Sequence, residues 1–369
     1  MKKILHIQVL PKLSGVQNIS YEVLRALPAE EYDKYILFSS EGTTGDKEFL
    51  EQQFNSIGVK VLYSDNLVRE LDAKKDFMAF KEIKSLCKKQ KFDIVHTNSS
   101  KPGVVGRIAA WLAGVPLVVH TVHGIAFHKF EKFPKWQFYY LCEMFSSLFC
   151  HKIVLVNRYY QKYFGLFKNK TLTIYNAIDY KKFKGIVKKQ NDDGKIRVLF
   201  VGRLDAQKNP ISLLKTAKLV IEQNKEVIFT LVGDGELMND CQHFVTENNL
   251  TQNVILAGWQ NNPGKFYSEA DIFAASSIYE AFGLMFLEAG YFHLPICATN
   301  VEGVPEVISD GVSGFLCEPN DEKTFADRIL KLCNDEQLRV KMGDEAFKRS
   351  TEVFNIERMG TEYRNLYEG

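Results

Sequence analysis

The sequence lacks several features that would assign it to a membrane-spanning, disulfide-linked or metal-binding class. No segment of the 369 residues reaches the ~18 apolar residues that a transmembrane helix needs. The seven cysteines are odd in number and scattered, without a CxxC pair, which is typical of reduced thiols in a cytoplasm. There is no metal-ligand spacing such as HExxH, no P-loop and no Ser-His-Asp order. We therefore expect a cytoplasmic protein with reduced thiols and no bound metal.

The chain is too long for one ordinary hydrophobic core, so we expect two domains. Its start, MKKILHIQVL, mimics a signal peptide, but the apolar run is short, contains His6 and Gln8 and has no small-residue cleavage site. We interpret it as a buried first strand.

Short β-branched runs alternate with segments of helical period along the whole chain, which predicts βαβ units and parallel sheets. The expected strands are 3–10, 34–40, 59–65, 92–98, 116–124, 152–157 and 171–179, then 196–204, 226–235, 253–259, 271–277, 294–300 and 314–319. The polar stretch 181–195 breaks both periods and marks a domain boundary. The prediction is two doubly wound, Rossmann-like domains, 1–180 and 190–353, facing a cleft, with an amphipathic helix over 354–369.

The net charge of +2 hides two halves of opposite sign. Residues 1–180 carry 25 Lys/Arg against 17 Asp/Glu, whereas residues 181–369 carry 22 against 28. This asymmetry suggests that the two domains have different partners.

Residues suited to binding a diphosphate follow the expected strands of the second half. Arg203 and Lys208 lie between a strand and a helix, where two cations beside a helix N-terminus suit a diphosphate, although two solvated surface charges would look the same. Gly233 and Gly235, in LVGDGE, would let the backbone approach a ligand or would simply form a turn. Trp259 ends another strand, either in the core or beside a nucleotide base.

The stretch YEAFGLMFLEAG places Glu280 and Glu288 around a bulky apolar run. Gly283 would open a helix whose backbone N–H groups favour a negatively charged ligand. Glu288 would then lie about two turns into that helix, where a ribose diol would satisfy its carboxylate. Pairing of both glutamates with nearby Lys or Arg is an equally good explanation from spacing alone.

The order of four motifs decides between these explanations. GRL-x4-KN, GDG, E-A-F-G-L-x3-E-A and EGVPEVI-x2-GVSGFL together resemble glycosyltransferase family 4, the retaining transferases of the GT-B fold that include glycogen synthases and bacterial mannosyltransferases. The resemblance spans the chain and is densest over 196–320. It implies two Rossmann-like domains, a C-terminal helix that crosses back onto the first, and chemistry without a divalent ion or other cofactor.

The resemblance also implies roles for individual residues. Arg203 and Lys208 match the diphosphate clamp, Glu288 the ribose carboxylate, Glu280 the carboxylate near the donor sugar, and His123 a histidine near the reacting carbon. Of these residues, His123, Glu280, Arg203 and Lys208 are the expected catalytic residues, and Glu288 is expected to bind the donor. The other expected donor contacts are Gly15, Gly233, Asp234, Gly235, Trp259, Ala281, Phe282, Gly283 and Leu284. His96, His120 and His128 are expected to be structural.

A basic, aromatic segment distinguishes the first half. Ten Lys/Arg against two acidic residues occupy 96–172. Rings and lysines interleave over 127–136, which suits an anionic bilayer surface better than nucleic acid, although a solvated helix face is the alternative. The expected membrane residues are Phe127, Lys129, Phe130, Lys132, Phe133, Lys135 and Trp136. Leu141, Phe145 and Leu148 are expected in the core.

The run 96–124 resembles bacterial transferases that extend lipid-diphosphate-linked glycans. That resemblance places Ser99, Ser100, Lys101, Gly103 and His123 on the acceptor side, with Lys101 near the lipid diphosphate. The prediction is transfer of a hexose or N-acetylhexosamine from a nucleotide-diphosphate sugar, with UDP favoured, to a lipid-linked saccharide in surface-polysaccharide assembly. The enzyme would be peripheral on the inner face of the cell membrane. The alternatives are a UDP-sugar 2-epimerase of the same fold and a non-catalytic membrane-associated scaffold with a nucleotide pocket.

Overall fold

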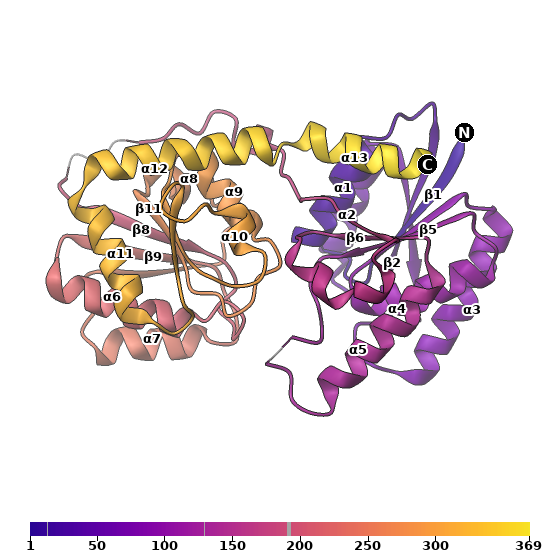
Figure 1. Ribbon diagram of the computed structural model, residues 1–369, viewed down its shortest axis with the longest axis horizontal. Helices are drawn as coiled ribbons and strands as arrows, with labels where there is room; N and C mark the ends of the chain where they lie inside the picture. Colours follow the sequence, from indigo (N-terminus) through magenta and orange to yellow (C-terminus); the bar gives the residue numbers. More distant parts are fainter. Residues whose placement is uncertain (13, 129, 190–192) are drawn as a thin grey trace. The chain divides into compact units, whose positions relative to one another are not determined.

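The computed structural model describes the chain except residues 13, 129 and 190–192, and it divides into two compact units (Figure 1). The first unit comprises Met1–Asn176 and Ile356–Gly369, and the second comprises Ala177–Asn355. The chain therefore enters the second unit before the expected boundary. Tyr180 stacks on Tyr291 with ring centroids 4.5 Å apart, and Phe183 packs against Phe292 at 5.0 Å, so aromatic contacts hold this segment to the second unit.

The first unit is built on a seven-stranded, entirely parallel sheet in the order β3-β2-β1-β4-β5-β6-β7. Its strands are β1 (Lys2–Ile7), β2 (Tyr32–Ser39), β3 (Val59–Ser64), β4 (Ile94–Asn98), β5 (Leu117–Val122), β6 (Lys152–Leu155) and β7 (Thr171–Thr173). Its α-helices are α1 (Gly15–Arg25), α2 (Thr44–Ser56), α3 (Ala73–Gln90), α4 (Ser100–Leu112), α5 (Lys135–Ser146) and α13 (Ile356–Glu368).

The second unit repeats this plan with a six-stranded parallel sheet in the order β10-β9-β8-β11-β12-β13. Its strands are β8 (Ile196–Val201), β9 (Val227–Val232), β10 (Val254–Gly258), β11 (Ile272–Ala275), β12 (Ile296–Thr299) and β13 (Gly314–Cys317). Its α-helices are α6 (Pro210–Gln223), α7 (Met238–Glu247), α8 (Gly264–Glu269), α9 (Leu284–Tyr291), α10 (Val304–Val307), α11 (Glu322–Asn334) and α12 (Glu336–Lys348).

The strands read as continuous apolar runs because helices cover both faces of a parallel sheet. In β1, Ile4, Leu5 and Ile7 have no exposed surface. In both units the strand order reverses beside the first strand, which creates a topological switch point at the carboxyl ends of β1 and β4 and of β8 and β11. Ligands of open α/β sheets bind at such points. The prediction of two doubly wound domains is confirmed.

Helix α13 belongs to the first unit, where it packs against α1 (Figure 1). The hydroxyl group of Tyr367 lies 2.5 Å from Nδ1 of His96 and 3.2 Å from Nε2 of His6. Nε2 of His96 lies 2.7 Å from the hydroxyl group of Thr121, which is also 3.3 Å from that of Tyr363. Three strands of the sheet, β1, β4 and β5, thus bind the end of the chain through buried polar contacts. No α-helix in the described part of the chain has the length and hydropathy that a membrane span requires.

Candidate functional site

The loop between β8 and α6 carries the two cations predicted to bind a diphosphate. The Arg203 side chain is mostly exposed, and its guanidinium lies 3.0 Å from Asp205 and donates to Gln207 at 2.9 Å. The loop closes with Asn209 in the left-handed conformation (φ 49°), directly before Pro210 at the first position of α6. The Ser276 hydroxyl, just after β11, donates to the Asn209 carbonyl at 2.8 Å. The loop that follows β8 is therefore linked directly to the end of β11.

Lys208 and Glu280 form an ion pair at the same edge of the sheet. Their side chains are 12% and 11% exposed, so each charge needs the other to remain satisfied. The Lys208 backbone N–H donates to Asp205 at 3.0 Å, which fixes the loop that presents the ammonium. The sequence predicted that Lys208 and Glu280 belong to one site, and in the structure the two side chains are in contact.

Helix α9 begins at this site. Gly283 precedes it with φ 81°, and a Cβ there would lie 2.5 Å from the Phe286 ring, so a side chain would be both strained and crowded. Phe282 is buried edge-to-face against Phe354 at 5.3 Å, which anchors the turn. The first N–H groups of α9, beginning at Leu284, have no acceptor within the helix and present a partial positive charge. Ala281 is half-buried in the turn before it.

Glu288 lies near the middle of α9 and is already held by two groups. The Tyr267 hydroxyl donates to its Oε2 at 2.7 Å, and the Lys182 ammonium lies 2.5 Å from its Oε1. Burial and the neighbouring carboxylate raise the pKa of Tyr267 well above its usual value, so this phenol remains a donor. Both glutamates thus have the structural partners that spacing alone allowed, and Glu288 keeps 14% of its side-chain surface exposed.

The two glycines of the GDG turn are explained by packing between loops. A Cβ on Gly233, which has φ 144°, would lie 1.8 Å from the Gly202 carbonyl oxygen, and one on Gly235 would lie 2.4 Å from that of Leu204. The Leu204 N–H also donates to the Asp234 carbonyl at 2.9 Å. Direct approach of these glycines to a ligand is therefore not needed to explain them. Trp259 is mostly exposed, and its Nε1 donates to Asn261 at 3.1 Å, so it is not a core residue.

Comparison with known proteins agrees with this geometry. Two family descriptions match the chain in succession: "Glycosyltransferase Family 4" over residues 13–182 and "Glycosyl transferases group 1" over residues 182–349. An Escherichia coli protein named UDP-Gal:alpha-D-GlcNAc-diphosphoundecaprenol alpha-1,3-galactosyltransferase is 33% identical over 99% of this chain and 96% of its own. The chain is a GT-B glycosyltransferase.

A further relative agrees with this family, and a solved structure agrees with the fold. The capsular polysaccharide biosynthesis glycosyltransferase CapM of Staphylococcus aureus is 27% identical over 83% of this chain and 86% of its own. The crystal structure of Anabaena HepE in complex with UDP and glucose superposes with a TM-score of 0.83 over the whole of both chains at 19% identity, which shows a common fold. The predicted family and fold are confirmed.

In the first unit of the transferase, His123 follows β5 and is partly buried. Its Nε2 lies 3.0 Å from the Asn98 side-chain oxygen at the end of the neighbouring strand β4. Desolvation lowers the pKa of His123 to about 3, so the imidazole is neutral near pH 7. It is therefore suited to hydrogen bonding rather than to carrying positive charge. Gly15 is exposed and begins α1, after the other switch-point strand β1.

The predicted acceptor residues fall into two groups. Ser99, with φ 69°, and Ser100 lie at the N-terminus of α4, both half-buried. Lys101, however, forms a 2.8 Å ion pair with Asp76 of α3 and has little exposed surface, so its ammonium is already neutralised. A Cβ on Gly103 would lie 2.4 Å from the buried ring of His120, so this glycine permits helix–strand packing. Lys101 and Gly103 thus each have a structural role, and their contact with an acceptor stays a prediction.

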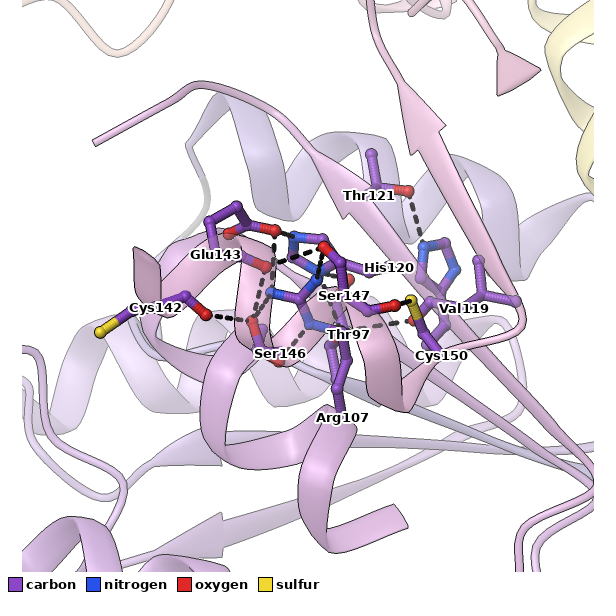
Figure 2. A network of polar contacts seen from close by, with 12 residues as sticks. Thr97, Arg107, Val119, His120, Thr121, Cys142, Glu143, Ser146, Ser147 and Cys150 are labelled. Atoms are coloured by element: carbon purple, nitrogen blue, oxygen red, sulfur yellow. Dashed lines mark hydrogen bonds and ion pairs between the residues drawn. The ribbon is translucent and has the colours of Figure 1, made fainter. Parts of the chain in front are cut away.

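Beneath these residues lies a buried polar network that the sequence interpretation missed (Figure 2). Arg107 is fully buried, and its guanidinium lies 2.9 Å from the Glu143 carboxylate and donates to the Ser146 hydroxyl at 2.6 Å. Its Nε donates to the Gly103 carbonyl at 2.6 Å. Nδ1 of His120 lies 2.9 Å from the Thr97 hydroxyl, and burial followed by the Arg107 charge lowers the pKa of His120. Arg107 in the small, apolar run VVGRIAA was the available signal.

The predicted membrane segment is only partly exposed. Phe127 is buried, with its ring 5.3 Å from that of Tyr140 and 5.4 Å from that of Tyr163, so its interfacial assignment is wrong. Lys129 lies outside the described residues. The other predicted membrane residues are exposed: Phe130, Lys132, Phe133, Lys135 and Trp136. Conversely, Leu141, Phe145 and Leu148 are exposed rather than in the core.

No described group of three or more His, Cys, Asp or Glu side chains is arranged to hold a metal ion. Metal independence itself stays a prediction.

Proposed function

We propose that the transferase moves a hexose or N-acetylhexosamine, with retention, from a UDP-sugar to a lipid-diphosphate-linked saccharide acceptor in bacterial surface-polysaccharide assembly. The observation that carries the proposal is the convergence of Arg203, the Lys208–Glu280 pair and the N-terminus of α9 at the carboxyl edge of the second sheet. Two cations and a helix N-terminus suit a diphosphate, and no other bound group is needed to supply positive charge.

In this proposal the transferred sugar's anomeric carbon loses its bond to the diphosphate oxygen and gains one, on the same face, to an acceptor hydroxyl oxygen. The proton of that hydroxyl group passes to the departing diphosphate. Negative charge grows on the departing diphosphate, and Arg203 and Lys208 stabilise it. Glu280, beside Lys208, accepts from hydroxyl groups of the donor sugar. Glu288, oriented by Tyr267, accepts from the ribose diol. Because the two cations neutralise the leaving group, we propose a reaction that continues in the presence of a metal chelator.

Support for the donor and the acceptor comes from relatives. The Escherichia coli relative is named for a UDP-galactose donor and a GlcNAc-diphosphoundecaprenol acceptor, and the superposed Anabaena structure holds UDP and glucose. Ser99, Ser100 and the neutral His123 are the groups we propose to face the acceptor, since they end or follow the neighbouring strands β4 and β5. An acceptor of this kind would bring the enzyme to the inner face of the cell membrane as a peripheral protein.

A donor screen tests the proposal. The purified chain is incubated with a panel of UDP-, GDP- and TDP-sugars, with and without a GlcNAc-diphospho-polyprenol in detergent, and nucleotide release and glycolipid product are measured. We expect acceptor-dependent release of UDP and a product whose new linkage has the anomeric configuration of the donor by NMR. Release of UDP with a free epimerised sugar and no glycolipid would indicate a 2-epimerase. Nucleotide binding without turnover of any donor would indicate a scaffold.

A further inference from the structure

The exposed large apolar side chains are concentrated on one part of the first unit. Of the 23 such side chains among the described residues, 11 lie between residues 111 and 166. Four of them form a stripe along α5 and the short turn that follows it, at intervals of three and four residues. This α5 stripe consists of Phe138, Leu141, Phe145 and Leu148, each more than half exposed.

Helix α5 is held in this orientation by its opposite face. Glu143 and Ser146 bind the buried Arg107 of α4 (Figure 2). Met144 of α5 is also buried. Turning the stripe inward would therefore carry Glu143 and Ser146 away and leave Arg107 buried without its carboxylate partner. The contacts of Arg107 therefore place four large apolar side chains in water. Monomeric proteins rarely expose large contiguous apolar patches.

Lysines lie at both ends of the α5 stripe. Lys132 and Lys135 are exposed at the start of α5. Lys170 borders the other end, where its ammonium donates to the Cys150 carbonyl at 2.9 Å and approaches that of Leu148 at 3.5 Å. Of the two acidic residues in 96–172, Glu143 is buried against Arg107, so it does not offset this charge at the surface.

We propose that the α5 stripe is a docking surface for an anionic phospholipid bilayer, with its apolar side chains in the interfacial layer and the lysines among the lipid headgroups. An amphipathic helix with lysines beside large apolar and aromatic groups has the chemistry that such a layer binds. A second copy of this chain is the poorer occupant. A two-fold interface brings the same patch from each subunit together, and here that would bring two clusters of lysines together.

The proposal differs from attraction by charge alone in its dependence on salt. Binding through lysines alone disappears in about 1 M salt, where the Debye length falls to about 3 Å. Insertion of the α5 stripe adds an apolar contribution that salt does not screen. Part of the vesicle binding is therefore expected to survive high salt. The inference rests on the proposed function for its biological meaning, because a lipid-linked acceptor is met at a bilayer, but its test needs neither donor nor acceptor.

The test is co-sedimentation of the full chain with vesicles of phosphatidylglycerol and phosphatidylcholine, and with phosphatidylcholine alone. The stripe variant is Leu141→Gln with Phe145→Gln. A matched control is Leu71→Gln with Phe49→Gln, which removes equally exposed side chains of the same types from another part of the same unit. We expect at least a tenfold loss of vesicle partitioning for the stripe variant and less than a twofold change for the control. Unchanged thermal unfolding and UDP binding confirm that both variants are folded.

Three outcomes would overturn the proposal: equal binding by the stripe variant and wild type, complete loss of wild-type binding in high salt, or no wild-type binding to anionic vesicles. Sedimentation equilibrium without lipid tests whether a second copy of the chain covers the stripe. If wild type and control form a dimer and the stripe variant does not, the stripe is a dimer interface and the bilayer proposal is wrong. Failure of the transferase itself is recognised separately, by absence of turnover on the detergent-solubilised acceptor while vesicle binding persists.

Discussion

The hydroxyl group of Tyr267, on α8, donates a 2.7 Å hydrogen bond to the carboxylate of Glu288, on α9. Tyr267 is fully buried, so this bond fixes the direction in which the carboxylate presents its remaining surface. The proposed ribose contact therefore depends on a residue that carries no binding role of its own.

Replacing Glu288 with alanine is expected to weaken binding of UDP itself, because the ribose acceptor is lost. Tyr267→Phe should weaken it less, by about 2- to 13-fold, since one hydrogen bond is worth about 0.5–1.5 kcal/mol. Isothermal titration calorimetry with UDP measures both. Glu280→Ala is the matched control, expected to bind UDP normally and to transfer sugar slowly. If Glu288→Ala and Glu280→Ala bind UDP equally well, the division of roles between the two glutamates is wrong.

Arg203→Ala and Lys208→Ala are expected to lower turnover by about 10- to 150-fold each, the equivalent of about 1.5–3 kcal/mol for a charge-assisted contact. Their effects on stability should differ. Arg203 is 60% exposed, so its loss should leave the melting temperature unchanged, whereas loss of Lys208 leaves the buried Glu280 without its partner. Adding Glu280→Gln to Lys208→Ala should restore stability without restoring activity. Wild-type turnover in either folded single variant would refute the diphosphate assignment.

Tyr367→Phe is expected to destabilise the first unit by about 1–3 kcal/mol, because it leaves polar atoms of His96 and His6 buried without their partner. Tyr363→Phe is the control, since it removes only a 3.3 Å contact to Thr121 and should cost less. Urea unfolding followed by tryptophan fluorescence measures both. Removal of residues 356–369 should be more damaging than either, while UDP affinity, which we propose resides in the second unit, should persist. Full transferase activity of the truncated chain would contradict this.

The first unit should lose stability as the solution is acidified. Burial lowers the pKa of His6 and His123 to about 3, and lowers that of His96 and His120 as well, from an unfolded value of 6.5. The unfolded chain therefore binds more protons below pH 6.5. The free energy of unfolding is therefore unaffected by these rings above pH 6.5. It falls as the pH drops from 6.5 toward 3, by up to about 1.4 kcal/mol per pH unit for each ring.

Urea unfolding at pH 7 and pH 5 measures this dependence. In a Trp259→Phe background the two remaining tryptophans, Trp111 and Trp136, report only on the first unit. The described histidines of the second unit, His243 and His293, are exposed, so a Trp111→Phe, Trp136→Phe variant that reports on that unit should shift less. Equal shifts in the two variants would show that the buried histidines are not the cause.

The fold and much of the candidate site followed from local pattern. Each strand is a short apolar run because helices cover both faces of its sheet, so strands such as β1 and β8 were recognisable from the sequence. Arg203, Lys208 and Gly283 were found because parallel strands bring their carboxyl ends to one edge, which makes residues after a strand candidates without any knowledge of side-chain contacts.

Tertiary structure decided the features that depend on distant partners. The segment containing α5 is apolar on more than one side, so its period could not show that Leu141, Phe145 and Leu148 face outward; burial of Arg107 with Glu143 decides that. Two other features also depend on residues distant in the sequence. Lys101 pairs with Asp76, and the backbone oxygen of Gly202 excludes a side chain at Gly233. Sequence spacing determines which residues share an edge or a face, whereas only packing between elements determines what occupies the space beside each of them.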